Sequence, residues 1–131
     1  HLKAGDNCGF GTFGKFSSQL VVTRTSAGRG ELRARLIEST QAGPVTQARG
    51  EARAIPLNDV WLSVDMDFTT DKTALAYSLD GKTWIDMPGT FPLAYDWRTG
   101  TFQGEQFGLF CYNPGEGGGR IDVDSFTLSK P

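Results

Sequence analysis

The sequence predicts an all-β fold, a sandwich of two antiparallel sheets formed by a single domain over residues 1–131. Three observations favour this fold. Glycine contributes 17 of the 131 residues and aromatic residues 11%, which is typical of turn-rich β domains. Apolar and polar residues alternate along most segments, and no long stretch keeps a helical period. A chain of this length can bury one hydrophobic core and is too short for two.

The first part of the chain is expected to form four strands. Turn-forming residues separate the alternating segments, which lie at residues 4–10, 17–25, 31–40 and 45–55. The third of these segments also fits a helix, because Leu32, Leu36 and Ile37 lie at helical spacing. Its two-residue alternation and its β surroundings favour a strand.

The middle of the chain contains the clearest strand, Val60–Phe68. Alternation gives it one apolar face and one mixed face, with Leu62, Val64, Met66 and Phe68 on the first and Trp61, Ser63, Asp65 and Asp67 on the second. A further strand is expected over Thr73–Leu79. Asp80-Gly81 then lies between apolar flanks, which is the strongest short hairpin signal in a sequence.

The closing part of the chain is predicted to form a hairpin. Phe107–Tyr112 is apolar on both faces, which favours an interior strand over a half-exposed one. Residues 113–119 are the densest cluster of turn formers in the chain, and Ile121–Leu128 alternates again. We therefore expect Phe107–Tyr112 to pair with Ile121–Leu128 inside a sheet.

Charge and composition exclude several function classes. The formal net charge is −2 and the basic residues are scattered, so neither nucleic acid nor an anionic membrane surface is an expected partner. No apolar run approaches the length needed to span a bilayer. The only histidine is His1, which argues against a catalytic triad with histidine and against most types of zinc site. Cys8 and Cys111 each lie in an apolar segment, which favours buried thiols; a disulfide is the alternative if their strands are neighbours in an oxidising compartment.

Catalytic carboxylates are not apparent. Asp65 with Asp67, and Asp122 with Asp124, form same-face pairs, but nothing marks one member as buried and protonated, as a glycosidase acid requires. We therefore expect no enzyme activity in the isolated chain and no cofactor. Calcium binding by such oxygen pairs is an alternative.

Two segments carry a resemblance to a known family. Phe107-Gly108-Leu109-Phe110, then Gly118-Gly119 and residues 121–126, resembles the closing hairpin of the C-terminal concanavalin A-like β-sandwich of family 43 glycoside hydrolases, the β-xylosidase and α-arabinofuranosidase group. Tyr77–Trp84 matches a hairpin that is common in sandwiches of this jelly-roll type. Ile121, Val123 and Ser125 depart from the small or aromatic residues usual in that family.

The resemblance implies a non-catalytic accessory domain of a plant-polysaccharide-degrading hydrolase of the xylan or arabinoxylan type. Its partners would be a catalytic domain and a xylo- or arabino-configured carbohydrate. Phe102, in the motif Phe102-x-Gly104, would reach the sugar pocket of that enzyme; the alternative is a core or loop aromatic. Such a domain fits a secreted or an intracellular oligosaccharide-degrading system.

The resemblance also implies that the chain corresponds to the C-terminal part of a larger domain, because strands precede this point in the family. A sandwich without those strands exposes sheet edges and apolar surface. We expect this surface to be covered by self-association or by the N-terminal segment, supplied as a separate chain.

An autonomous carbohydrate-binding module is the alternative function. Tyr95, Trp97 or Trp61 would stack on pyranose rings, while Arg98, Asp65 or Asp67 would bind hydroxyl groups. The competing interpretation is structural: Tyr95 and Trp97 would plug one end of the sandwich, and Trp61 would be buried by another layer.

Overall fold

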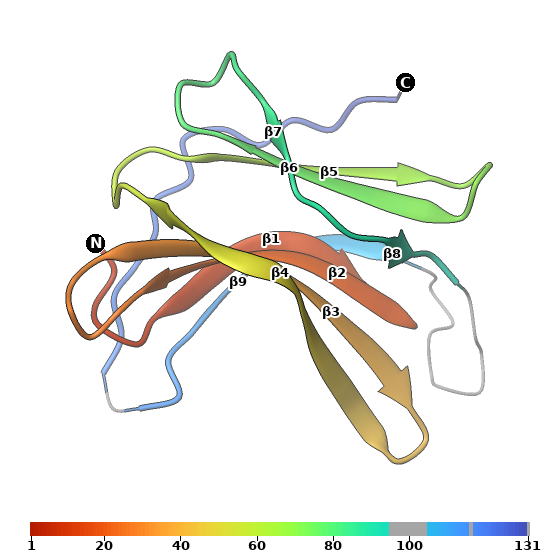
Figure 1. Ribbon diagram of the computed structural model, residues 1–131, viewed down its shortest axis with the longest axis horizontal. Helices are drawn as coiled ribbons and strands as arrows, with labels where there is room; N and C mark the ends of the chain where they lie inside the picture. The colour runs from red at the N-terminus through yellow and green to blue at the C-terminus, as the bar shows by residue number, and fades with distance from the viewer. Residues whose placement is uncertain (95–104, 116, 131) are drawn as a thin grey trace.

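The computed structural model describes residues 1–94, 105–115 and 117–130, and every regular element in them is a β-strand (Figure 1). No helix that could span a membrane occurs in these residues. The described strands are β1 (Asn7–Phe13), β2 (Phe16–Arg24), β3 (Gly30–Thr40), β4 (Gly43–Ile55), β5 (Trp61–Asp67), β6 (Lys72–Ser78), β7 (Ile85–Asp86), β8 (Phe91–Pro92) and β9 (Gln106–Tyr112).

The strands form two antiparallel sheets, which confirms the predicted all-β sandwich. One sheet has the order β4-β3-β2-β1-β9, and the other has the order β5-β6-β7, with β8 pairing to β6. Figure 1 shows β5, β6 and β7 as a layer over the five-stranded sheet. The strands predicted from alternation near residues 17–25, 31–40, 45–55 and 60–68 are present as β2, β3, β4 and β5.

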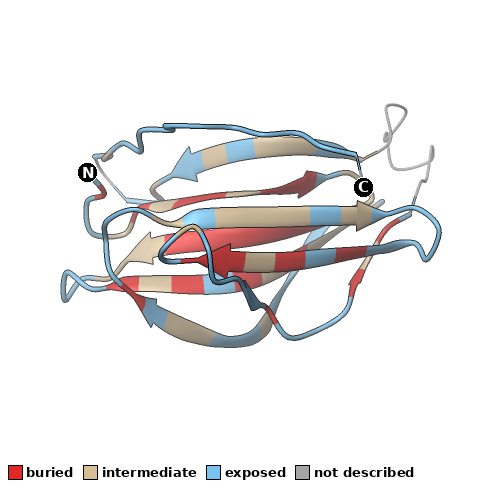
Figure 2. Ribbon diagram, turned by 90° about the horizontal axis from the view of Figure 1, so that it is seen from above, coloured by how far each residue is buried: buried red, intermediate tan, exposed pale blue. Residues whose placement is uncertain are grey.

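The core lies between the two sheets, which both contribute buried side chains. Figure 2 shows buried positions alternating with more exposed ones along several strands. β2 and β3 contribute Leu20 and Leu32, which are fully buried, and β6 contributes Leu75 and Tyr77. Phe91 of β8 is also buried and closes the core beside Met87. The two-residue period that predicted the strands therefore also determines which side chains are inside.

The prediction for the closing hairpin is wrong. β9 lies at the edge of its sheet and pairs with β1, and residues 121–128 form no strand. The apolar residues on both faces of β9 predicted an interior strand, but the structure places them on an edge strand that is partly covered on each face. Leu109, opposite Phe10, remains 47% exposed, and on the other face Arg35 stacks on Phe110 and Tyr112 at 5.6 and 5.7 Å. Each face of β9 is thus only partly covered, so its apolar pattern does not require an interior position.

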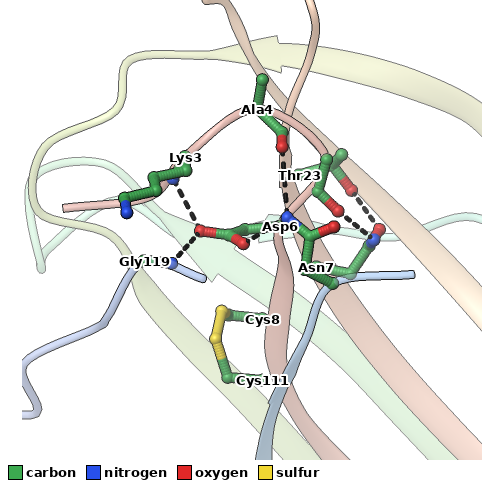
Figure 3. The surroundings of a disulfide bond; sticks show 10 residues. Lys3, Ala4, Asp6, Asn7, Cys8, Thr23, Cys111 and Gly119 are labelled. Atoms are coloured by element: carbon green, nitrogen blue, oxygen red, sulfur yellow. Dashed lines mark hydrogen bonds between the residues drawn. A yellow bond between two sulfur atoms is a disulfide. The ribbon is translucent and has the colours of Figure 1, made fainter. Parts of the chain in front are cut away.

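Cys8 and Cys111 lie directly opposite each other on β1 and β9 and are joined by a disulfide (Figure 3). The expectation of buried free thiols was therefore wrong, and the alternative that required neighbouring strands is confirmed. Cys8 is buried, so the bridge fastens the edge strand to the core side of β1.

Removing the bridge should destabilise the domain. Because Cys8 and Cys111 are 103 residues apart in sequence, the bridge removes much chain entropy from the unfolded state. Replacing both cysteines with alanine should lower the free energy of unfolding by about 2 to 5 kcal/mol, measured by urea denaturation. The parent protein in reducing buffer is the matched control, because it loses the bridge but keeps both cysteine side chains. Equal stability of the oxidised and reduced parent would contradict the expectation.

Candidate functional site

Of the residues predicted to bind substrate, Trp61 lies within the described part of the chain. The other four, Tyr95, Trp97, Arg98 and Phe102, lie in residues 95–104, outside the described residues. Their proposed contacts with sugar stay predictions.

Trp61 begins β5 opposite Ser78 of β6, and its side chain is 39% exposed. It is therefore not buried under another layer of this chain. The indole rests against Gly81: a Cβ atom at Gly81 would approach the Cε2 atom of Trp61 to 2.9 Å. Gly81 also has a positive φ of 73°. Glycine is required here for its conformation and for the space under the ring.

The turn that supports Trp61 is fixed by Asp80. Its Oδ1 atom accepts hydrogen bonds from the Thr83 and Lys82 amides at 2.7 and 2.8 Å and from the Ser78 hydroxyl at 2.9 Å. These bonds, led by the one from Thr83, lower the pKa of Asp80 to about 2. The carboxylate is thus ionised over the neutral range, and the surface under Trp61 is organised before any ligand arrives.

Trp61 shares the outer side of its sheet with small and acidic residues. We call this surface the outer tryptophan face; it comprises Trp61, Ser63 and Asp65 of β5, Ala74 and Ala76 of β6, and Asp86 of β7. Ser63, Ala76 and Asp86 are neighbours across the three strands. Because the central strand carries only small side chains here, the indole and the carboxylates are the groups that project. An aromatic face beside carboxylate acceptors can contact a sugar ring and its hydroxyl groups.

Asp67, by contrast, is engaged in the β5–β6 turn. It accepts hydrogen bonds from the hydroxyl of Thr70 and from the amides of Thr69 and Thr70. The Thr70 hydroxyl is the main cause of its lowered pKa. Asp67 therefore has a structural role, which disfavours its predicted role as a sugar ligand. No group of three or more histidine, cysteine, aspartate or glutamate residues suited to a metal occurs among the described residues.

A second carboxylate, Asp6, joins distant parts of the chain and was missed by sequence analysis. It is only 1% exposed, and its Oδ2 atom accepts hydrogen bonds from the Lys3 and Gly119 amides at 2.6 and 2.8 Å (Figure 3). Its Oδ1 atom accepts one from Asn113 at 2.8 Å. The Lys3 amide bond is the main cause of its lowered pKa. No local pattern signals the contacts with Asn113 and Gly119, because these two partners lie more than 100 residues away.

Comparisons with known proteins agree with this architecture. Residues 1–129 match the family model described as the beta-xylosidase C-terminal concanavalin A-like domain. A beta-xylosidase of Formosa agariphila is 34% identical over 73 residues, which are 56% of this chain and 11% of that protein. A GH43 glycoside hydrolase, engineered to display both endo-xylanase and exo-arabinofuranosidase activity, matches 89% of this chain with a TM-score of 0.60 and 23% identity. The match covers 24% of that structure's chain, so this chain spans a minor part of both relatives.

Proposed function

The chain belongs to the family of β-xylosidase C-terminal concanavalin A-like domains, and from this membership we propose that it is a non-catalytic accessory domain of an enzyme that degrades xylan or arabinoxylan. The observation that carries the proposal is the family match over residues 1–129. The activities named for the two relatives, a xylosidase and a xylanase with arabinofuranosidase activity, support this substrate class. The sandwich would support a catalytic domain that supplies the reacting carboxylates.

The isolated chain should not hydrolyse aryl β-xylosides or aryl α-arabinofuranosides. Asp6, Asp67 and Asp80 are each held as hydrogen-bonded anions, whereas a glycosidase acid must hold a proton at the pH of the reaction. Burial raises the pKa of Glu105 to about 7, but both of its carboxyl oxygens are shielded from solvent and so cannot contact a substrate. The measurement is release of the aryl group by the purified chain, with a polypeptide that also contains the catalytic domain as positive control. Turnover by the isolated chain that disappears after one substitution within it would refute the proposal.

Phe102 is proposed to contribute to the sugar pocket of the complete enzyme, on the basis of the Phe102-x-Gly104 motif. Phe102→Ala should then leave the stability of the isolated domain nearly unchanged, whereas loss of a buried core phenylalanine costs about 3 to 5 kcal/mol. In the complete enzyme it should raise KM or lower kcat. Leu20→Ala is the core control that should show the larger loss of stability. If Phe102→Ala unfolds the domain, the residue belongs to the core.

Carbohydrate binding by the outer tryptophan face is the second candidate function. The observation that favours it is the exposed Trp61 ring, held in place on the Asp80 turn. Trp61→Ala should weaken the retention of the isolated domain by soluble arabinoxylan in affinity electrophoresis about tenfold, which corresponds to about 1.4 kcal/mol. Phe68→Ala removes another exposed aromatic just beyond β5 and should have no effect. Equal retention of the parent and the Trp61 variant would contradict this role.

We further propose that the open edge of β9 packs against another β-strand, from a longer polypeptide or a second copy. Leu109 is exposed on this strand, as are Ile121, Val123, Phe126 and Leu128 in the segment that follows it. An edge strand with exposed apolar residues favours pairing with another chain.

The isolated domain should therefore self-associate as its concentration rises, which sedimentation velocity can measure. Leu109→Lys places a charge on the edge strand and should shift the population to monomer. Val45→Lys is the control, because Val45 is equally exposed but lies on β4 at the opposite edge. Monomers of the parent at all concentrations would argue against a second copy as the partner of β9.

A further inference from the structure

Glu105, the residue before β9, places a carboxyl group in a buried position where neither oxygen makes a hydrogen bond of ordinary geometry. Neither of its oxygens is accessible to solvent, and neither has a hydrogen-bond partner among the residues that the structure describes. The carboxyl lies on Gly14 in the β1–β2 turn, where any Cβ atom would collide with it. An ionised carboxylate in this place would lose its hydration shell without a full replacement by hydrogen bonds from the protein. The surroundings therefore favour the neutral acid.

The neighbouring groups offset only part of this cost. Burial is the dominant effect and raises the pKa of Glu105 to about 7, against smaller opposing contributions from the Phe16 amide and the Thr12 hydroxyl. The Thr12 hydroxyl accepts a hydrogen bond from the Ser18 amide at 2.9 Å, so it can stabilise the carboxylate only through its single donor hydrogen.

The adjacent charged groups are also engaged. Lys15 of the β1–β2 turn donates to the Ser39 carbonyl at 2.9 Å and pairs with Glu38 of β3 at 3.5 Å. Thr12 of β1 and Phe16 of β2 carry no titratable group, and Glu38 has the same sign as an ionised Glu105. Among the residues that the structure describes, no cation forms an ion pair with this carboxyl.

We propose that Glu105 is a pH-sensitive anchor for the start of β9: the neutral carboxyl is seated in the β1–β2 turn, and the ionised carboxyl leaves it for water. The edge position of β9 allows this, because only its pairing with β1 is disturbed. Its register with β1 begins at Gln106 opposite Phe13, directly after the anchor. The Cys8–Cys111 bridge holds the other end of the strand, so detachment is confined to its first residues.

The sign of the pH effect follows from the raised pKa. Between about pH 4.5 and pH 7 the folded protein retains a proton that the unfolded chain has released. The free energy of unfolding therefore falls as pH rises through this window and levels off above it. The unfolding equilibrium constant should increase by at most about 300-fold from this group. The increase is smaller if the ionised carboxyl moves out into water.

Two measurements test the anchor. A carbon-detected NMR titration of the parent domain should show the Glu105 carboxyl titrating near pH 7. Amide hydrogen exchange at Gln106 and Phe107 should accelerate across that range by more than the intrinsic exchange rate rises with pH. Exchange at Cys111 should show no such additional acceleration. Glu105→Gln, which cannot ionise, should abolish the acceleration and flatten the stability profile between pH 4.5 and 8. Glu51→Gln, at an exposed position on β4, should leave both unchanged.

Titration of the Glu105 carboxyl in the ordinary range of a glutamate, or identical pH profiles of the parent and the Glu105→Gln protein, would overturn the proposal. Because both measurements use the isolated domain, they succeed or fail independently of its role in an enzyme.

Discussion

The pairing of β1 with β9 brings together segments that are about a hundred residues apart, and the arrangement of the sheet depends on it. The other neighbours in this sheet, β1 to β4, follow one another along the chain as hairpins, whose loops are short and lose little entropy on closing. Pairing of β9 with β1 closes a long loop and therefore costs more chain entropy. The Cys8–Cys111 bridge offsets part of that cost because it restricts the unfolded chain. The same pairing brings Asn113 and Gly119 within hydrogen-bonding distance of Asp6.

The local parts of this fold could be predicted from the sequence, because alternation and turn residues act over a few positions. β3 shows this: Leu32 and Leu36 fit a helix as well as a strand, yet the two-residue alternation was the correct signal. The non-local part could not be predicted. The pairing of β9 with β1 is accompanied by contacts between distant residues, such as the Cys8–Cys111 bridge and the hydrogen bond from Asn113 to Asp6, which no periodicity encodes.

In the candidate site, too, local features could be predicted from the sequence and non-local contacts could not. The Asp80-Gly81 hairpin signal correctly located a turn, but the use of that turn as a support for Trp61 depends on how close β5 lies to it. Asp65 and Asp67 look equivalent in sequence, and only the hydrogen bonds of Asp67 distinguish its structural role. Function was indicated by family motifs around Phe107–Phe126 rather than by the physics of the fold, since one fold serves many functions.

The bridge between Cys8 and Cys111 also affects how damage to the chain would appear. A peptide bond cut anywhere between these two residues leaves two pieces that are still joined covalently through sulfur. A protease-nicked domain would then migrate as a single species in a denaturing gel and separate only after reduction. An apparently intact band under non-reducing conditions is therefore no proof of an intact backbone in this protein.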